Sequence, residues 1–217
     1  MVVAPLVLSV VAAYLLGSIP TGLWLSRRLT GQDIRQLGSG NTGATNVLRT
    51  VGWRAALPVV VFDVGKGLVA VLLGRLLAAV FGLDPELRPL TDSLTAFAAI
   101  AGHNWPLYAG FRGGRGVATG FGTLIAISPT VALVTILLGA VIIVGTDTVS
   151  AGSLGGALIA VLLMSGFGDH RYLPYVIVSA IVVVLQHRGN IYRLVHGTER
   201  RLGVRDKLLG RFLPRGW

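Results

Sequence analysis

Two long stretches of this chain carry almost no charged side chains. Residues 2–26 contain none, and residues 58–80 contain only Asp63, Lys66 and Arg75. About 20 consecutive apolar residues are enough for a helix to cross the hydrocarbon core of a bilayer. Only 13% of the 217 residues are charged, whereas roughly a quarter is usual in a soluble domain. The sequence therefore excludes an ordinary water-soluble protein and predicts an all-α, polytopic membrane helical bundle.

Seven apolar ranges are expected to be transmembrane helices: residues 3–25, 53–81, 90–105, 117–127, 131–144, 153–164 and 174–185. Ser128 and Pro129 separate the fourth range from the fifth. Because the residue before a proline avoids the helical region, this stretch forms either two short helices or one kinked helix. The first range lacks the basic start of a signal peptide, so we expect it to stay as a span. Residues 1–217 then form a single integral membrane domain.

Most basic residues fall on one side of this seven-span layout. Of the 19 lysines and arginines, 15 lie in residues 27–54, 110–116 and 187–217. Lys and Arg mark cytoplasmic loops, which predicts an external N-terminus and a cytoplasmic C-terminus. Lysines and arginines at this position contact anionic lipid headgroups. We therefore interpret the net charge of +10 as a sign of membrane lipid as partner and expect no binding of nucleic acid. Alternating basic and apolar residues after Gly197 predict a short helix on the inner leaflet.

The first polar segment on the predicted cytoplasmic side is residues 38–49, which contains Ser39, Asn41, Thr45, Asn46 and Arg49. Its glycines allow the backbone N–H groups to form an anion-binding nest. Ser and Asn side chains would add neutral hydrogen bonds, and Arg49 would add positive charge. The alternative is that these side chains only cap the helix that follows.

The second polar segment is residues 102–119. Gly113, Gly114, Arg115 and Gly116 precede a predicted span, and a glycine-rich turn at a helix N-terminus presents unpaired N–H groups to an anion such as phosphate. The spacing is not that of a P-loop. The alternative is that the glycines only allow close helix packing, with the arginines as ordinary cytoplasmic charges.

The third polar segment is residues 187–199. In a helix, His187, Asn190 and Arg193 would follow one another at intervals of three residues. A histidine at the membrane surface is able to donate or accept a proton near neutral pH. The alternative is an inert surface histidine.

Asp63 and Lys66 lie within a predicted span, three residues apart. Each would cost about 2.5 to 3.5 kcal/mol unpaired near the bilayer centre. We therefore expect them to pair on one face of the helix, either as a purely structural pair or in support of a site.

Several common catalytic designs are missing. The chain has no cysteine, no Gly-x-Ser-x-Gly elbow, and no histidine followed five residues later by aspartate. The acidic residues on the predicted cytoplasmic side are scattered, so we expect no metal and no cofactor. Phosphate-binding segments beside an apolar bundle instead indicate a ligand with a phosphate head and an apolar tail.

Taken together, the three segments resemble the motifs of one family, the bacterial acyl-phosphate:glycerol-3-phosphate acyltransferases known as PlsY. Residues 39–49 resemble its first motif, residues 102–119 its second and residues 187–199 its third, and residues 63–67 resemble part of its second span. The resemblance runs through nearly the whole chain. It implies transfer of an acyl chain from acyl phosphate to the 1-hydroxyl of glycerol 3-phosphate, giving lysophosphatidic acid and inorganic phosphate at the bacterial inner membrane.

The resemblance also implies roles for residues. The catalytic group would be His187, Asn190 and Ser39. Substrate would be bound by Arg49, Arg115, Asn41, Thr45, Asn46, Gly113, Gly114, Gly116, Thr119 and Arg193. Structural support would come from Glu199, Asp63, Lys66 and His103. An acyl phosphate is already activated, so no covalent acyl-enzyme is expected, and either His187 or a substrate phosphate oxygen would take the hydroxyl proton.

The family's second motif usually has lysine at the position of Arg115. Arginine keeps the charge but binds phosphate through a planar fork, and we expect activity to survive. The resemblance further suggests functional coupling to the enzyme that makes acyl phosphate. The alternative function is a transporter or flippase for a phosphorylated small molecule or lysolipid, which basic pockets and glycine-broken helices would also suit.

Overall fold

The computed structural model of this chain describes residues 2–203, and within this range it contains helices and no strands. Its α-helices are α1 (Val3–Gly17), α2 (Thr21–Thr30), α3 (Ala44–Thr50), α4 (Trp53–Val80), α5 (Arg88–Asn104), α6 (Val117–Ile127), α7 (Pro129–Thr146), α8 (Val149–Phe167), α9 (Leu173–Gln186) and α10 (Arg188–Val195). Short 3₁₀ turns lie at η1 (Ile34–Gln36), η2 (Pro85–Leu87), η3 (Leu107–Ala109) and η4 (His170–Tyr172). The predicted all-α class is confirmed.

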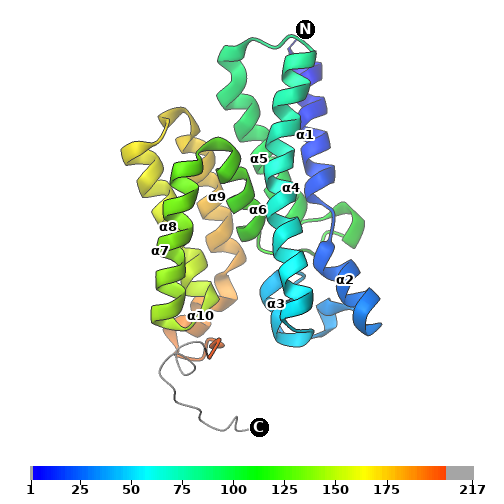
Figure 1. Cartoon of the computed structure of the whole chain (residues 1–217), viewed down its shortest axis with the longest axis vertical. Coiled ribbons are helices and arrows are strands. Elements are labelled where there is room, and N and C mark those ends of the chain that lie inside the picture. The colour runs from blue at the N-terminus through cyan, green and yellow to red at the C-terminus, as the bar shows by residue number, and fades with distance from the viewer. Residues whose placement is uncertain (1, 204–217) are drawn as a thin grey trace.

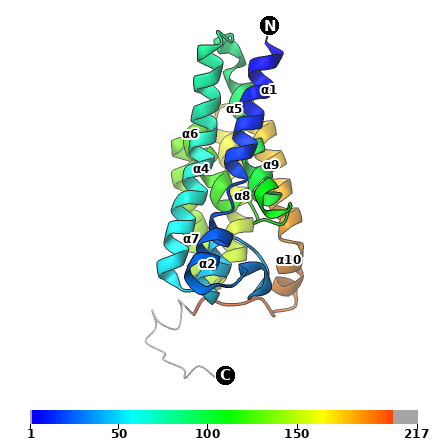
Figure 2. The same cartoon turned by 90° about the vertical axis from the view of Figure 1, so that its right-hand side faces the viewer.

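The long helices form an elongated bundle in which successive members run in opposite directions (Figures 1 and 2). Helix α4 packs on α1, α5 and α6, while α7 packs on α8 and α8 on α9. The chain starts at one end of the bundle, and α2, α3 and α10 gather at the other end (Figure 1). The first and third polar segments therefore share one end, as the seven-span layout predicted.

Glycines bring pairs of helices into backbone contact. A Cβ atom at Gly17 of α1 would lie 2.2 Å from the Ala99 carbonyl oxygen of α5. One at Gly122 of α6 would lie 1.9 Å from the Val64 carbonyl oxygen of α4. Small residues at these crossings let membrane helices approach closely, which is how such bundles pack without a hydrophobic driving force.

Each of the seven predicted apolar ranges contains a helix. Among residues 2–203, four helical stretches are long and apolar enough to cross a membrane alone, and a fifth is added when the bent pair α9 and α10 counts as one span. Helix α5 has 17 residues and α6 has 11. At 1.5 Å per residue, α6 covers only about 17 Å of a hydrocarbon core about 30 Å thick. The seven-span count and the orientation of the termini stay predictions.

The structure decides between the two readings of the Ser128–Pro129 junction. Ser128 has a φ of −146° and a ψ of 89°, so α6 ends before it and α7 begins at Pro129. The stretch therefore forms two helices. The predicted helix on the inner leaflet falls mainly in residues 204–217, which lie outside the described residues.

Candidate active site

The first polar segment is shaped by Asn46. This side chain is 2% exposed, and its Nδ2 donates hydrogen bonds to the carbonyl oxygens of Ile34, Leu37 and Asn41 at 3.2, 3.0 and 2.9 Å. Its Oδ1 accepts from the backbone N–H of Ser39 at 2.9 Å. The Asn46 amide therefore holds the loop in shape and has little capacity left for a substrate.

The other polar side chains of this loop are more accessible. Ser39 is exposed, and Asn41 and Thr45 are partly buried. Oδ1 of Asn41 accepts from the N–H of Gly43 at 2.8 Å. The loop is linked to the second polar segment through Arg35, whose Nη1 donates to the carbonyl oxygen of Ala109 at 2.9 Å.

The second polar segment rests on the last turn of α5. The Gly114 N–H donates to the carbonyl oxygen of His103 at 3.0 Å, and a Cβ atom on Gly114 would lie 1.9 Å from His103 Nε2. A Cβ atom on Gly113 would lie 2.2 Å from the same carbonyl oxygen. Gly116 has a φ of +76° directly before α6, a conformation that glycine adopts without strain. The close packing of Gly113 and Gly114 on His103 places Arg115 directly before α6.

The third polar segment begins at a sharp bend. Helices α9 and α10 meet at 64°, with His187 between them. Nδ1 of His187 lies 2.7 Å from the Val183 carbonyl oxygen, which only accepts, so Nδ1 carries the proton. Burial lowers the pKa of His187 to about 4, and the positive charge of Arg115 lowers it too. The imidazole is therefore neutral at pH 7, with Nε2 as its free acceptor.

Glu199 is the anionic centre of this segment. Its Oε1 accepts from Asn190 Nδ2 at 2.6 Å and from Ser150 Oγ at 3.1 Å, and its Oε2 accepts from Arg193 Nε at 2.8 Å. Burial raises the pKa of Glu199, but these donors outweigh it and the pKa is lowered. Glu199 and Arg193 thus form an ion pair. Asn190 Oδ1 is buried and has no partner within residues 2–203.

Three arginines, one from each polar segment, carry charges that interact with the charge of Glu199. Arg193 is bonded to it, and the charges of Arg49 and Arg115 act on Glu199 and on Arg193. The pKa of Arg49 and that of Arg115 are both lowered, mainly because the side chains are buried. The negative charge of Glu199 opposes this shift, and the positive charges of neighbouring arginines add to it. These three positive charges exceed the single negative charge of Glu199, which suits an anionic phosphate group.

Asp63 and Lys66 form the ion pair that their spacing predicted. Lys66 Nζ lies 2.8 Å from Asp63 Oδ1, and both side chains are almost fully buried. His103 Nδ1 lies 3.6 Å from the same carboxylate oxygen. Thr119 is also buried, with a hydroxyl that has no partner in the described part of the chain.

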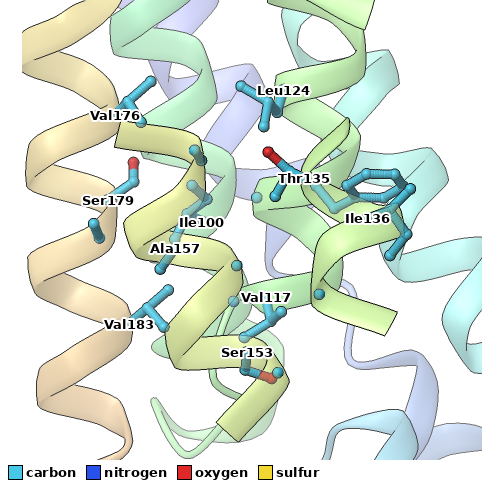
Figure 3. A pocket seen from close by; sticks show the side chains of 18 of the residues that line it. Ile100, Val117, Leu124, Thr135, Ile136, Ser153, Ala157, Val176, Ser179 and Val183 are labelled. Carbon is cyan, nitrogen blue, oxygen red and sulfur yellow. The ribbon is translucent and has the colours of Figure 1, made fainter. Parts of the chain in front are cut away.

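An apolar pocket begins beside the polar cluster. Helices α6, α7, α8 and α9 line it, with Val117 and Val183 toward the cluster and Leu124 and Val176 farther along (Figure 3). Val117 follows Arg115 by two residues, and the Val183 carbonyl oxygen bonds to His187. Between Gly116 and Leu124 the pocket extends along α6 for about 12 Å at the helical rise per residue.

The structure adds residues that the sequence reasoning missed. Ser150 reaches Glu199 from the start of α8, and the carbonyl oxygen of Arg200 accepts from Arg49 Nη2 at 3.1 Å. The N–H of Leu202 donates to the carbonyl oxygen of Asp147 at 2.9 Å, which ties this segment to the α7–α8 turn. The polar run 146–150 on the predicted cytoplasmic side was the signal that could have found Ser150.

Comparison with known proteins agrees with this geometry. The family model for glycerol-3-phosphate acyltransferase matches residues 7–197. Glycerol-3-phosphate acyltransferase 3 of Dehalococcoides mccartyi is 43% identical over 95% of this chain and 100% of its own. The glycerol-3-phosphate acyltransferase of Thermus thermophilus is 46% identical over 89% of this chain and 93% of its own.

Two solved structures share the fold. They are the glycerol 3-phosphate form and the lysophosphatidic acid form of PlsY, an integral membrane glycerol 3-phosphate acyltransferase. They superpose with TM-scores of 0.82 and 0.80 at 36% and 34% identity, and each comparison covers 94% of this chain and 98% of the other. With the family model matching most of its length, this chain is an integral membrane protein and belongs to the glycerol-3-phosphate acyltransferase family, PlsY.

Proposed function

We propose that this chain transfers an acyl group from acyl phosphate to the 1-hydroxyl of glycerol 3-phosphate, releasing lysophosphatidic acid and inorganic phosphate. The observation that carries the proposal is the cluster of Arg49, Arg115 and Arg193 beside two free acceptors, at the start of an apolar pocket. The relatives are named for glycerol-3-phosphate acylation, and one PlsY structure holds lysophosphatidic acid. The acyl-phosphate donor is part of our proposal.

The arginine cluster would bind the phosphate groups. Arginine forms charge-assisted, bidentate hydrogen bonds with phosphate, and burial strengthens them. Glu199 leaves the cluster with surplus positive charge while it holds Arg193 in place. Ser39, Asn41 and Thr45 would complete the binding from the first loop, whereas we assign Asn46 a positioning role because its amide is used by that loop.

Two acceptors match the two hydroxyl groups of glycerol 3-phosphate. Nε2 of His187 is unprotonated, and Oδ1 of Asn190 is buried without a partner among residues 2–203. A buried acceptor left without a donor costs about 1–3 kcal/mol, which a substrate hydroxyl would recover. The hydroxyl at His187 would attack the acyl carbonyl carbon, its proton would pass to Nε2, and the bond from that carbon to the phosphate oxygen would break.

The apolar pocket would hold the acyl chain. Its side chains are largely aliphatic, and glycines and alanines on α8 leave room between α7 and α9 (Figure 3). Because the pocket begins next to Arg115 and His187, a chain in it would place its activated carbonyl at the polar cluster. Holding the two reacting groups in place in this way would add a proximity contribution to the proton transfer at His187.

The end of the bundle opposite the polar cluster favours an enzyme over a transporter. There, Arg75 Nη2 lies 2.8 Å from Asp92 Oδ2 and donates to the Ala126 carbonyl oxygen at 2.8 Å, while Tyr172 donates to Asp92 at 2.9 Å. Asp92 is fully buried. A transporter would have to break this network to open its site to the other side, whereas an acyltransferase needs one open end.

We place the protein in the bacterial inner membrane because of its family, and positive-inside bias supports an arginine cluster that faces the cytoplasm. Glycerol 3-phosphate would then reach the cluster from the cytoplasm and the donor from the membrane, and coupling to the enzyme that makes acyl phosphate would follow from the donor's lability.

The test uses detergent-purified protein given acyl phosphate and glycerol 3-phosphate, together and singly. Phosphate release and lysophosphatidic acid are both measured. We expect the two products in equal amounts and only when both substrates are present. Replacement of acyl phosphate by acyl-CoA or acyl carrier protein should abolish product. Product from either of these donors would refute the acyl-phosphate assignment. A folded sample without product, together with uptake of glycerol 3-phosphate into proteoliposomes, would favour the transporter.

A further inference from the structure

A buried ion pair lies in the middle of α4, and the free energy of folding gains little from it because both charges must be desolvated. Asp63 and Lys66 are 2% and 7% exposed and lie outside the arginine cluster. Replacing such a pair with apolar residues of similar volume is often neutral or even stabilising, because the desolvation of two charges is expensive. The contacts that the pair makes with other elements therefore matter more than the pair itself.

On one side the pair reaches the second polar segment. Asp63 Oδ1 approaches His103 Nδ1 at 3.6 Å. The carbonyl oxygen of His103 accepts a hydrogen bond from the Gly114 N–H, and the imidazole ring of His103 fills the space in which a Gly114 side chain would lie. One residue beyond Lys66, Gly67 allows α4 to touch α6, since a Cβ atom there would lie 2.1 Å from the Thr119 carbonyl oxygen.

On the other side the pair reaches the first polar segment. Lys66 Nζ donates to the carbonyl oxygen of Ile19 at 3.0 Å, in the break between α1 and α2. Gly22, in the first turn of α2, packs against Thr42, where a Cβ atom would lie 1.9 Å from the Thr42 carbonyl oxygen. Lys66 and Thr42 also border one small cavity. The pair thus contacts both the first polar segment, which contains Arg49, and the second, which contains Arg115.

We propose that Asp63, Lys66 and His103 form a buried bridge that positions the Arg115 turn relative to the first loop. They are positioning residues that act through Arg115 and touch no substrate. This inference rests on the proposed function, because it assumes that Arg115 binds a substrate phosphate.

The test compares kinetic signatures. Arg115→Ala first identifies which substrate KM depends on this side chain. The double variant Asp63→Leu/Lys66→Met, which removes both charges at similar volume, should raise the same KM about fivefold or more with little change in thermal stability. Combined with Arg115→Ala, it should add little further loss, since residues that act through one another are not additive. Asp92→Asn is the matched control, because it weakens a buried ion pair at the far end and should lower stability without changing KM.

Each outcome has a distinct meaning. An unchanged KM in a folded Asp63→Leu/Lys66→Met protein would overturn the bridge while leaving the Arg115 assignment intact. Full additivity with Arg115→Ala would also overturn it. An Arg115→Ala protein with unchanged kinetics would refute the phosphate assignment and the bridge together. Should the double variant fail to fold, His103→Leu keeps the ion pair and removes only the ring against Gly114, and it must raise the same KM.

Discussion

We expect substitutions of two buried asparagines, Asn46 and Asn190, to have opposite effects on stability and activity. Asn46 has four hydrogen bonds to the backbone of its loop, whereas Asn190 has one to Glu199 and leaves Oδ1 unpaired within the described residues. We therefore expect Asn46→Leu to lower mainly stability and Asn190→Leu to lower mainly activity.

The magnitudes follow from these contacts. Because three acceptors share the two Nδ2 hydrogens of Asn46, its amide makes about three full hydrogen bonds, and at about 1 kcal/mol net for each, Asn46→Leu loses about 3 kcal/mol. Asn190→Leu loses one charge-assisted bond of about 1.5–3 kcal/mol but also removes an unpaired buried acceptor that costs about 1–3 kcal/mol, so the two terms nearly cancel. For a protein of this size, 1 kcal/mol shifts Tm by about 2–4 °C, so Tm should fall by about 6–12 °C in Asn46→Leu and by clearly less in Asn190→Leu.

The assay pairs thermal unfolding in detergent with initial rates of phosphate release at a temperature where both proteins are folded. Asn190→Leu should lose at least about tenfold in kcat/KM for glycerol 3-phosphate, equivalent to about 1.4 kcal/mol. An Asn190→Leu enzyme with wild-type kinetics would refute the role of its Oδ1. A fall in its Tm as large as that of Asn46→Leu would refute the comparison of their hydrogen bonds.

Four further predictions concern the same site. Arg49→Ala should worsen KM for glycerol 3-phosphate or kcat about tenfold or more, and a folded variant with wild-type kinetics would remove Arg49 from the site. Arg115→Lys should remain active, because the charge is kept, and complete loss of turnover in a stable protein would show that the pocket requires the guanidinium. Gly156→Leu should slow long-chain donors more than short-chain donors, because the new Cβ atom has room at 3.8 Å from Thr135 Cγ2 and the rest of the leucine would fill the pocket. Gly166→Leu is the control, because Gly166 lies on the same helix with open space around it. Equal slowing of all donors would contradict the assignment of the pocket to the acyl chain. The pKa of His187 is lowered from 6.5 to about 4 in the folded protein, so between these pH values the unfolded chain takes up a proton that the folded chain does not. The free energy of unfolding should therefore fall by up to about 3 kcal/mol as the pH drops from about 6.5 to 4, and Tm should fall with it. His187→Asn should make Tm depend less on pH in this range, and an unchanged dependence would show that His187 is not buried as a neutral group.

Local sequence was sufficient for the features that depend on composition and short spacing. The absence of charge from long stretches determined an all-α membrane bundle, because the bilayer accepts only backbones whose hydrogen bonds are internally satisfied. The pairing of Asp63 with Lys66 followed from their separation of three residues on one helix. The resemblance of the three polar segments to one family also followed from their residues and order alone.

Tertiary structure decided which partners those polar residues have. Asn46 and Asn190 look alike in sequence, but one is used up by its own loop and the other has a free acceptor, because burial and partners depend on residues far away in the chain. The glycines before α6 suggested a phosphate nest, and the structure places His103 directly against two of them, Gly113 and Gly114. Glu199 is shared by Asn190, Ser150 and Arg193, and Ser150 comes from a helix 49 residues earlier. Sequence spacing reports neighbours on one helix, whereas the charge balance of a site depends on which helices pack together.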